Sequence, residues 1–248
     1  MSWEKQLFKD SVLSIAQGEV NGHSGQHKFG AVPSMSQNHT GTIWDVNDTR
    51  YPWGAWDAGP LIIQVVPASS GDIEKSVVVE GLDENWNLIS ETITTDSSPT
   101  PIGNSVNQFR RVFRAYAASD SLFLDDVAIQ RAGTTVAYIP VANAQTLMAV
   151  YTVPAGYTAY LMQGTASCQA NADATVSMFV RYAGELSFRI GHSLEVSGAG
   201  GQYNYNFSVP LRLPEKTDID VRATVRSNNA RVTAAFDMIL VQDGYEHV

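Results

Sequence analysis

Residues 218–226 alternate apolar and polar positions, with isoleucine, valine or alanine at every odd position. Successive side chains of a β-strand point to opposite faces of its sheet, so this period of two predicts a strand. We expect the apolar face to be buried and the polar face to be solvated. Asp218 and Asp220 are therefore predicted to point toward water.

The rest of the C-terminal half repeats this kind of segment. Further strands are expected over residues 145–153, 157–164, 176–182, 186–190, 203–209 and 232–241. Turn-forming residues separate them, as in Pro154-Ala155-Gly156. About seven strands at this spacing predict a jelly-roll-like β-sandwich over residues 141–248.

The middle of the chain is also divided into short, β-branched and aromatic segments. Strands are expected over residues 61–66, 76–80, 86–95, 109–116, 127–129 and 136–139. This spacing predicts a second β-sandwich over residues 58–140. The fold class is therefore all-β, with two sandwich domains that divide near residue 140.

The N-terminal segment, residues 1–57, has a different pattern. Trp3, Leu7 and Phe8 occur at helical spacings that continue to Ile15, which predicts a short helix. From residue 17 to 57 the periodicity disappears, and such a long irregular stretch is uncommon inside a compact domain. We therefore predict an N-terminal docking arm whose removal leaves a folded core.

Aromatic residues are concentrated in this predicted arm. Trp44, Tyr51, Trp53 and Trp56 carry too much apolar area to leave in water. They either fold under the chain's own sandwich or dock on another subunit. Together with Phe29, they are the candidate protein-interface residues.

Composition narrows the class of protein. Hydrophobic residues make up 44% of the chain and charged residues 17%, and the formal net charge is -9. Such a charge repels phosphate backbones, so direct nucleic-acid binding is not expected. No apolar run approaches the roughly 18 residues of a membrane span, and the start lacks a leader pattern. Cys168, the single cysteine, cannot form an intramolecular disulfide and is expected to be a buried hydrophobe made in a reducing cytoplasm.

Patterns that would indicate catalysis or metal binding are weak. His23 and His27 are four residues apart, but the glycines between and beside them argue against a helix, and no third ligand has an obvious spacing. The acidic pairs at 83–84 and 125–126 are most simply a turn and the start of a strand, with calcium at a subunit contact as an alternative. Hydrolase-elbow, Walker and dinucleotide motifs are missing. No metal, cofactor or catalytic residue is predicted, and the chain is not expected to be an enzyme.

Several short sequence segments resemble those of a known family. They are Lys28-Phe29-Gly30, Thr42-Ile43-Trp44-Asp45 and the segments at residues 77–83, 91–94, 109–112, 145–156 and 213–219, with Trp86. Together they resemble a group of virion structural proteins of tailed bacteriophages, especially marine and environmental ones. The resemblance implies an oligomeric, β-rich component present in many copies on the head or the tail, and it implies no catalytic residue. Residues 120–125 depart from the Gly-rich segment of many members.

The expected function is that of a capsid decoration or cement protein, a homotrimer that contacts the major capsid protein or other virion subunits. It would be assembled in the host's bacterial cytoplasm and located in the virion. A subunit that binds only the assembled shell stabilises that state, and attached protomers add avidity. The alternative is a tail fibre, nozzle or carbohydrate-binding adhesin with an exposed aromatic platform. A third reading, a carbohydrate-active enzyme, requires a cleft with two facing carboxylates.

Overall fold

A computed structural model describes residues 11–197 and 201–245, and it is almost entirely β. The prediction of an all-β chain with a short N-terminal helix is confirmed. The elements are α1 (Ser11–Ala16), β1 (His23–Met35), β2 (Thr40–Thr42), the 3-10 turn η2 (Trp53–Trp56), β3 (Gln64–Pro67), β4 (Ser76–Asp83), β5 (Leu88–Thr94), β6 (Gly103–Asn104), β7 (Phe109–Ala117), β8 (Val127–Arg131), β9 (Thr134–Ile139), β10 (Val150–Thr152), β11 (Tyr157–Cys168), β12 (Ala174–Arg181), β13 (Arg189–Val196), β14 (Gln202–Leu213), β15 (Asp218–Val225) and β16 (Ala230–Gln242). The predicted helical positions Trp3, Leu7 and Phe8 lie outside the described residues. No helix within the described ranges is long and apolar enough to cross a membrane.

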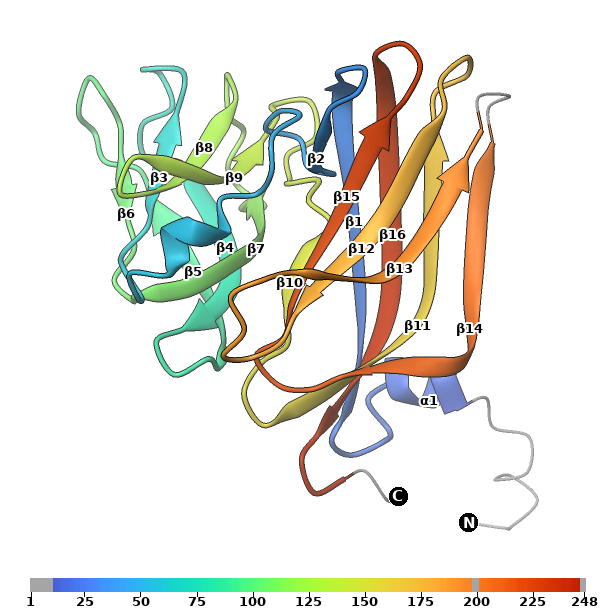
Figure 1. Cartoon of the computed structure of the whole chain (residues 1–248). Coiled ribbons are helices and arrows are strands. Elements are labelled where there is room, and N and C mark those ends of the chain that lie inside the picture. Colours follow the sequence, from blue (N-terminus) through green and yellow to red (C-terminus); the bar gives the residue numbers. More distant parts are fainter. Residues whose placement is uncertain (1–10, 198–200, 246–248) are drawn as a thin grey trace.

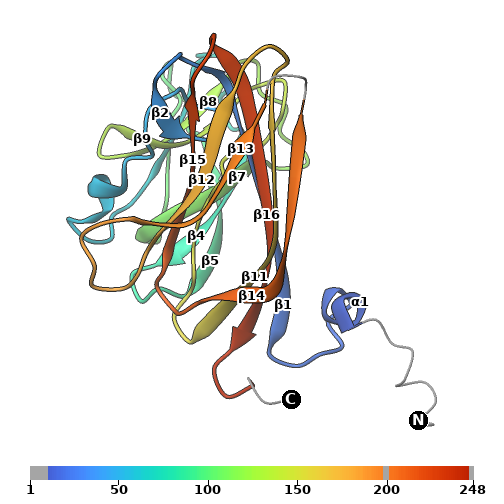
Figure 2. The same ribbon diagram turned by 45° about the vertical axis from the view of Figure 1, so that its right-hand side comes forward.

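The larger half of the molecule is a sandwich of two antiparallel sheets. Sheet I has the strand order β1-β16-β11-β14, and sheet II has the order β10-β15-β12-β13, with β2 also paired to β15. Figure 2 shows these sheets as two layers, with α1 on the outer side of sheet I. Their facing side chains bury an apolar core that includes Val32, Val221, Phe236 and Leu240.

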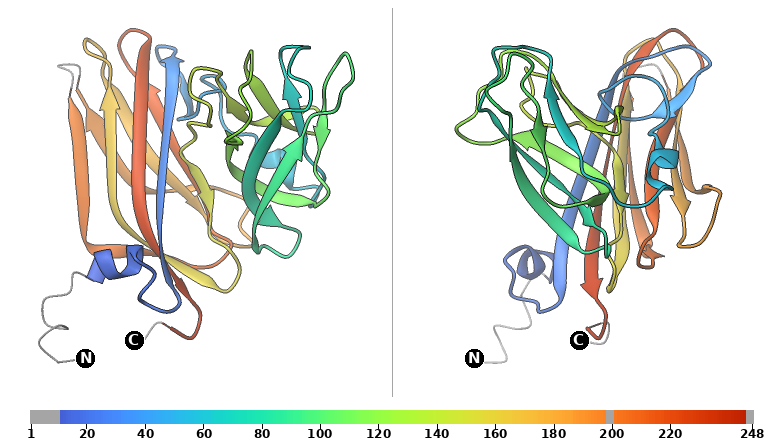
Figure 3. Two further views of the ribbon diagram at one scale, coloured as in Figure 1. Left: turned by 180° about the vertical axis from the view of Figure 1, so that it is seen from behind. Right: turned by 90° about the vertical axis from the view of Figure 1, so that its left-hand side faces the viewer.

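A smaller group of sheets lies beside this sandwich (Figures 1 and 3). Sheet III has the order β6-β3-β8-β9, and sheet IV has the order β5-β4-β7. The two cores interlock, because Leu82 and Phe113 pack in the core of the larger sandwich, while Met148 and Val150 pack in the smaller one. A division of the chain into two independent sandwiches therefore stays a prediction.

The structure corrects the prediction that residues 17–57 are irregular, because β1 and β2 lie within them. β1 pairs antiparallel with β16 from His23–Val241 to Met35–Ala230, and β2 pairs with β15. An added Cβ at Gly30 would lie 2.3 Å from the Ile43 carbonyl oxygen. This glycine allows a close approach of two backbone segments inside the fold. Removal of residues 1–57 would delete an edge strand of sheet I and is not expected to leave a folded core.

Two ionisable groups are buried near the junction of the sheet groups. Lys28 on β1 donates from Nζ to the carbonyl oxygen of Phe113 on β7, and burial lowers its pKa to about 7. Asp45 accepts a 2.7 Å hydrogen bond from the Leu147 amide, while its Oδ1 has no partner. Burial raises the pKa of Asp45 to about 7. Both side chains are therefore held where their charged forms are unfavourable.

Candidate functional site

A cluster of buried charges lies on the polar face of β15. Asp218 is 3% exposed and accepts a bidentate pair of hydrogen bonds from Arg111, at 2.9 and 3.1 Å. Arg181 donates to the same carboxylate at 2.6 and 3.0 Å, and the Thr152 hydroxyl donates at 2.6 Å. Two guanidiniums therefore share one carboxylate in the interior.

Asp220 forms a second buried group two residues along the strand. It accepts hydrogen bonds from the Thr42 hydroxyl at 2.8 Å, the Trp53 indole N–H at 2.9 Å and Arg222 at 2.8 Å. The Arg222 guanidinium also lies 4.2 Å from the ring centroid of Phe179. Both carboxylates are fully hydrogen-bonded and paired, which is the condition under which buried charges are tolerated.

The prediction that Asp218 and Asp220 face water is wrong. β15 does alternate, but both of its faces are buried. Its polar face is covered by η2, through Trp53, and by Arg111 from β7. Alternating polarity cannot distinguish a face covered by water from one covered by matched charges.

Trp86 lies at the edge of this cluster in the turn between β4 and β5. Its φ of 68° is in the left-handed region, and Asp83 holds the turn by accepting hydrogen bonds from the amides of Asn85 and Asn87, each at 2.8 Å. The guanidiniums of Arg110 and Arg111 each lie 5.0 Å from the Trp86 ring centroid. The turn thus places an indole against two arginines at the junction of the sheet groups.

A cavity of about 380 Å³ opens beside these groups. Its wall contains Trp56, Asp57, Trp86, Arg110, Arg111, Arg181, Tyr182, Ala183, Gly184, Glu185, Leu186, Lys216 and Asp218. A pocket of this size at a junction between structural units is a common place for a small ligand. Sequence reasoning missed it, because its residues come from five separate segments of the chain.

This cavity does not offer the paired carboxylates of a glycoside hydrolase. Asp218 is held by two guanidiniums, and Glu185 pairs with Arg189. Asp45 is the carboxyl group whose pKa is raised to about 7, and it does not line the cavity. The arrangement suits binding of a ligand better than acid–base chemistry on a sugar.

Four of the five candidate interface residues lie inside the chain. Trp44, Tyr51, Trp53 and Trp56 are buried in the chain's own core, where the Trp56 indole donates to the Tyr51 hydroxyl. Of the two alternatives given above for these four residues, folding under the chain's own sheets matches their position. Phe29 is half-buried on β1, with its ring centroid 5.6 Å from that of His27.

His23 and His27 contact different parts of the chain. His27 pairs with Asp237 on β16, and His23 contacts the backbone oxygen of Asn21 at 2.9 Å. Within residues 11–197 and 201–245, no group of three histidine, cysteine, aspartate or glutamate side chains could hold a metal ion. Cys168 is buried as a free thiol, as the sequence predicts.

The side of the sandwich farthest from sheets III and IV is open. Of the twelve residues of β14 only Leu213 is buried, and of the eight residues of β13 only Val196 is buried. These strands are the edges of sheets I and II and lie side by side in Figure 1. Exposed apolar side chains on them include Ile190 at 60% and Val209 at 81%.

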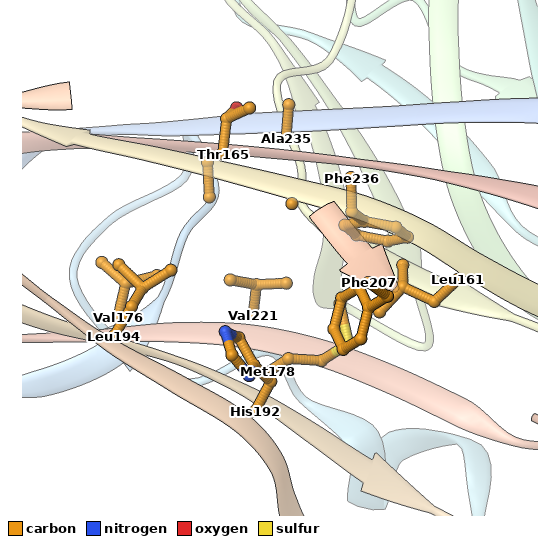
Figure 4. A pocket seen from close by; sticks show the side chains of 12 residues that line it. Leu161, Thr165, Val176, Met178, His192, Leu194, Phe207, Val221, Ala235 and Phe236 are labelled. Carbon is orange, nitrogen blue, oxygen red and sulfur yellow. The ribbon is translucent and has the colours of Figure 1, made fainter. Parts of the chain in front are cut away.

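Inside this open side lies a small cavity of about 30 Å³ (Figure 4). His192 points into it, and its Nε2 is buried without a hydrogen-bond partner. Its ring centroid lies 4.3 Å from that of Tyr205 and 5.3 Å from that of Phe207, which it meets edge to face. Burial lowers the pKa of His192. On this side of the sandwich, half-buried aromatic side chains therefore cover the core only in part.

Comparisons with known proteins identify no family for this chain. No family model matches the sequence, and no curated protein matches it. A solved chain described as "Cowpea mosaic virus top component (CPMV-T) - naturally occurring empty particles" aligns with 75% of this chain and 83% of its own, at 11% identity and a TM-score of 0.23. A score this low does not define a shared fold.

Proposed function

We propose that this chain is a structural, non-enzymatic subunit of a virus particle that assembles through protein–protein contacts. The observation that carries this proposal is the open β13–β14 side, where a strand of twelve residues has one buried residue. Exposed apolar side chains gathered on unpaired sheet edges are typical of surfaces that meet another subunit. The particular role we propose is that of a capsid decoration protein on the head of a tailed bacteriophage.

The partner proposed for this surface is another copy of the chain, in a homotrimer. The contact uses side chains more than strand pairing, because the pairing of β14 with β11 is interrupted between Asn206 and Leu211, and Pro210 lacks an N–H. Val209 lies in that interruption and is exposed. Trimers formed through this surface could bind the major capsid protein at many equivalent positions, with added avidity.

Val209→Lys tests the self-association. A lysine in an apolar contact is desolvated without a partner, so we expect the subunit dissociation constant to rise at least about tenfold. Sedimentation equilibrium measures that constant. Val106→Lys is the matched control, because Val106 is 88% exposed on the loop between β6 and β7, outside the β13–β14 side. A monomeric parent chain, or equal effects of the two variants, would contradict the proposal.

Location in the particle separates decoration from the alternative of a tail fibre, nozzle or adhesin. Subunit-resolution imaging of particles that contain the chain is expected to find it at repeated positions over the shell. Copies confined to the tail would reject the decoration role. The broader proposal, that the chain is a virion structural subunit, would still hold in that case.

A further inference from the structure

Arg110 lies in the wall of the 380 Å³ cavity. Its side chain is half-buried, and it donates from Nε to the Glu84 backbone oxygen at 3.4 Å. Among the described residues it forms no ion pair. Burial and the nearby charge of Arg111 lower its pKa against the opposing charge of Glu84, so its surroundings on balance disfavour its charge.

The neighbouring arginines add to this surplus. Arg111 and Arg181 share the single carboxylate of Asp218, which leaves one of their two charges without a counterion. Lys216 and Glu185, also in the wall, are each paired with a residue of opposite charge, Glu215 and Arg189. Asp57 is exposed to water at the rim. The wall therefore has four cationic side chains against the three carboxylates of Asp57, Glu185 and Asp218, in a chain whose net charge is -9.

We propose that this cavity is a binding site for a small organic anion whose carboxylate or phosphate group lies between Arg110 and the Arg111–Arg181 pair. Guanidinium groups bind both kinds of oxyanion through paired N–H donors. An anion placed here supplies the missing counter-charge while the wall excludes part of the competing water. The site is separate from the β13–β14 surface and does not depend on it.

The wall is organised before any ligand arrives. The carboxylate of Asp218 fixes the planes of two guanidiniums, and the Asp83 turn fixes the indole of Trp86. A ligand therefore loses little free energy to the ordering of these groups. Trp86, Tyr182 and Leu186 give the cavity an apolar portion that suits the carbon skeleton of a ligand. A monosaccharide acid is a suitable probe because it combines one carboxylate with a compact skeleton.

Isothermal titration calorimetry with glucuronate, glucose and inorganic phosphate tests the site. We expect glucuronate or phosphate to bind at millimolar or lower concentration, and glucose to bind at least about tenfold more weakly. Binding of glucuronate alone identifies a carboxylate ligand, and binding of phosphate alone identifies a phosphate ligand. If neither anion binds, or if glucose binds equally well, the proposal is overturned.

Arg110→Gln removes the proposed anion contact without touching the Asp218 cluster. We expect this variant to weaken anion binding at least about tenfold. Arg110→Lys keeps the charge and should retain part of the affinity. Arg212→Gln, at an exposed position of β14, is the control that should bind as the parent does. Unchanged binding by Arg110→Gln, in a variant with the parent's circular dichroism spectrum, would place the anion elsewhere and refute the site.

Discussion

Asp218→Ala is expected to lower the free energy of unfolding by about 3–5 kcal/mol, which is the usual cost of removing one partner from a buried ion pair. The guanidiniums of Arg111 and Arg181 would be left in the interior without their carboxylate. The hydroxyl of Thr152 would lose its acceptor as well. The loss is large because desolvated charges stay behind, and it does not measure the net worth of the intact cluster.

Chemical denaturation followed by tryptophan fluorescence measures this loss. Asp243→Asn is the control, since Asp243 is exposed and its described hydrogen bond is made by its backbone amide. Asp218→Asn keeps the shape of the side chain and removes the charge, so it is expected to fall between the two. A loss below about 1 kcal/mol for Asp218→Ala, the range of a surface ion pair, would show that the cluster is solvated.

The same variant tests how the sheet groups are joined. Arg111 lies on β7 in sheet IV, while Asp218 lies on β15 in sheet II. Their bidentate pair is therefore a polar connection between the two groups, alongside the apolar side chains that the cores share. We expect the parent chain to unfold in one transition and Asp218→Ala to broaden it, because weaker coupling lets the two groups unfold less cooperatively.

The strands of the C-terminal half could be predicted from sequence because their period of two is strong. Residues 218–226 predicted β15 almost to the residue. What the pattern could not supply was the environment of the polar face. Asp218 meets Arg111 across 107 positions of sequence, and no local signal reports such a partner.

In the N-terminal segment, by contrast, the strands themselves could not be predicted from the sequence pattern. β1 contains glycines and polar residues and lacks a clear alternation, so it resembled a loop. Its strand character comes from pairing with β16, which lies about 200 residues away. The tryptophans were recognised as residues that must be covered, but sequence alone could not decide whether the chain itself or a neighbour covers them. The burial of Trp56 at 1% exposure shows that the chain does.

The candidate anion cavity could not be predicted for a related reason. Arg110, Arg111 and Arg181 have no spacing that marks a motif, and Trp86 looked like one more strand aromatic. Their meeting depends on the register of β12 with β15, which places Arg181 directly opposite Asp218. A site built across sheets becomes visible only when the topology is known.

Lys28 and Asp45 predict an unusual dependence of stability on pH. The pKa of Lys28 falls from 10.5 to about 7 on folding, so between these values the unfolded chain binds more protons and stability rises with pH. The pKa of Asp45 rises from 3.8 to about 7, so over that range the folded chain binds more protons and stability falls as pH rises. Each effect amounts to at most about 4–5 kcal/mol, at 1.36 kcal/mol per pKa unit. The two contributions together have their minimum near pH 7.

Matched variants separate these contributions from those of the remaining ionisable groups, which cancel in a comparison with the parent chain. We expect Lys28→Met to be more stable than the parent at pH 7 and below, with the difference vanishing above pH 10.5, where the parent lysine becomes neutral in both states. Asp45→Asn should match the parent near pH 4 and become progressively more stable than it up to about pH 7. Urea denaturation across this range measures both differences. A stability difference that does not change with pH for either variant would mean that the group keeps its ordinary pKa in the folded chain, and hence that water reaches the junction where it lies.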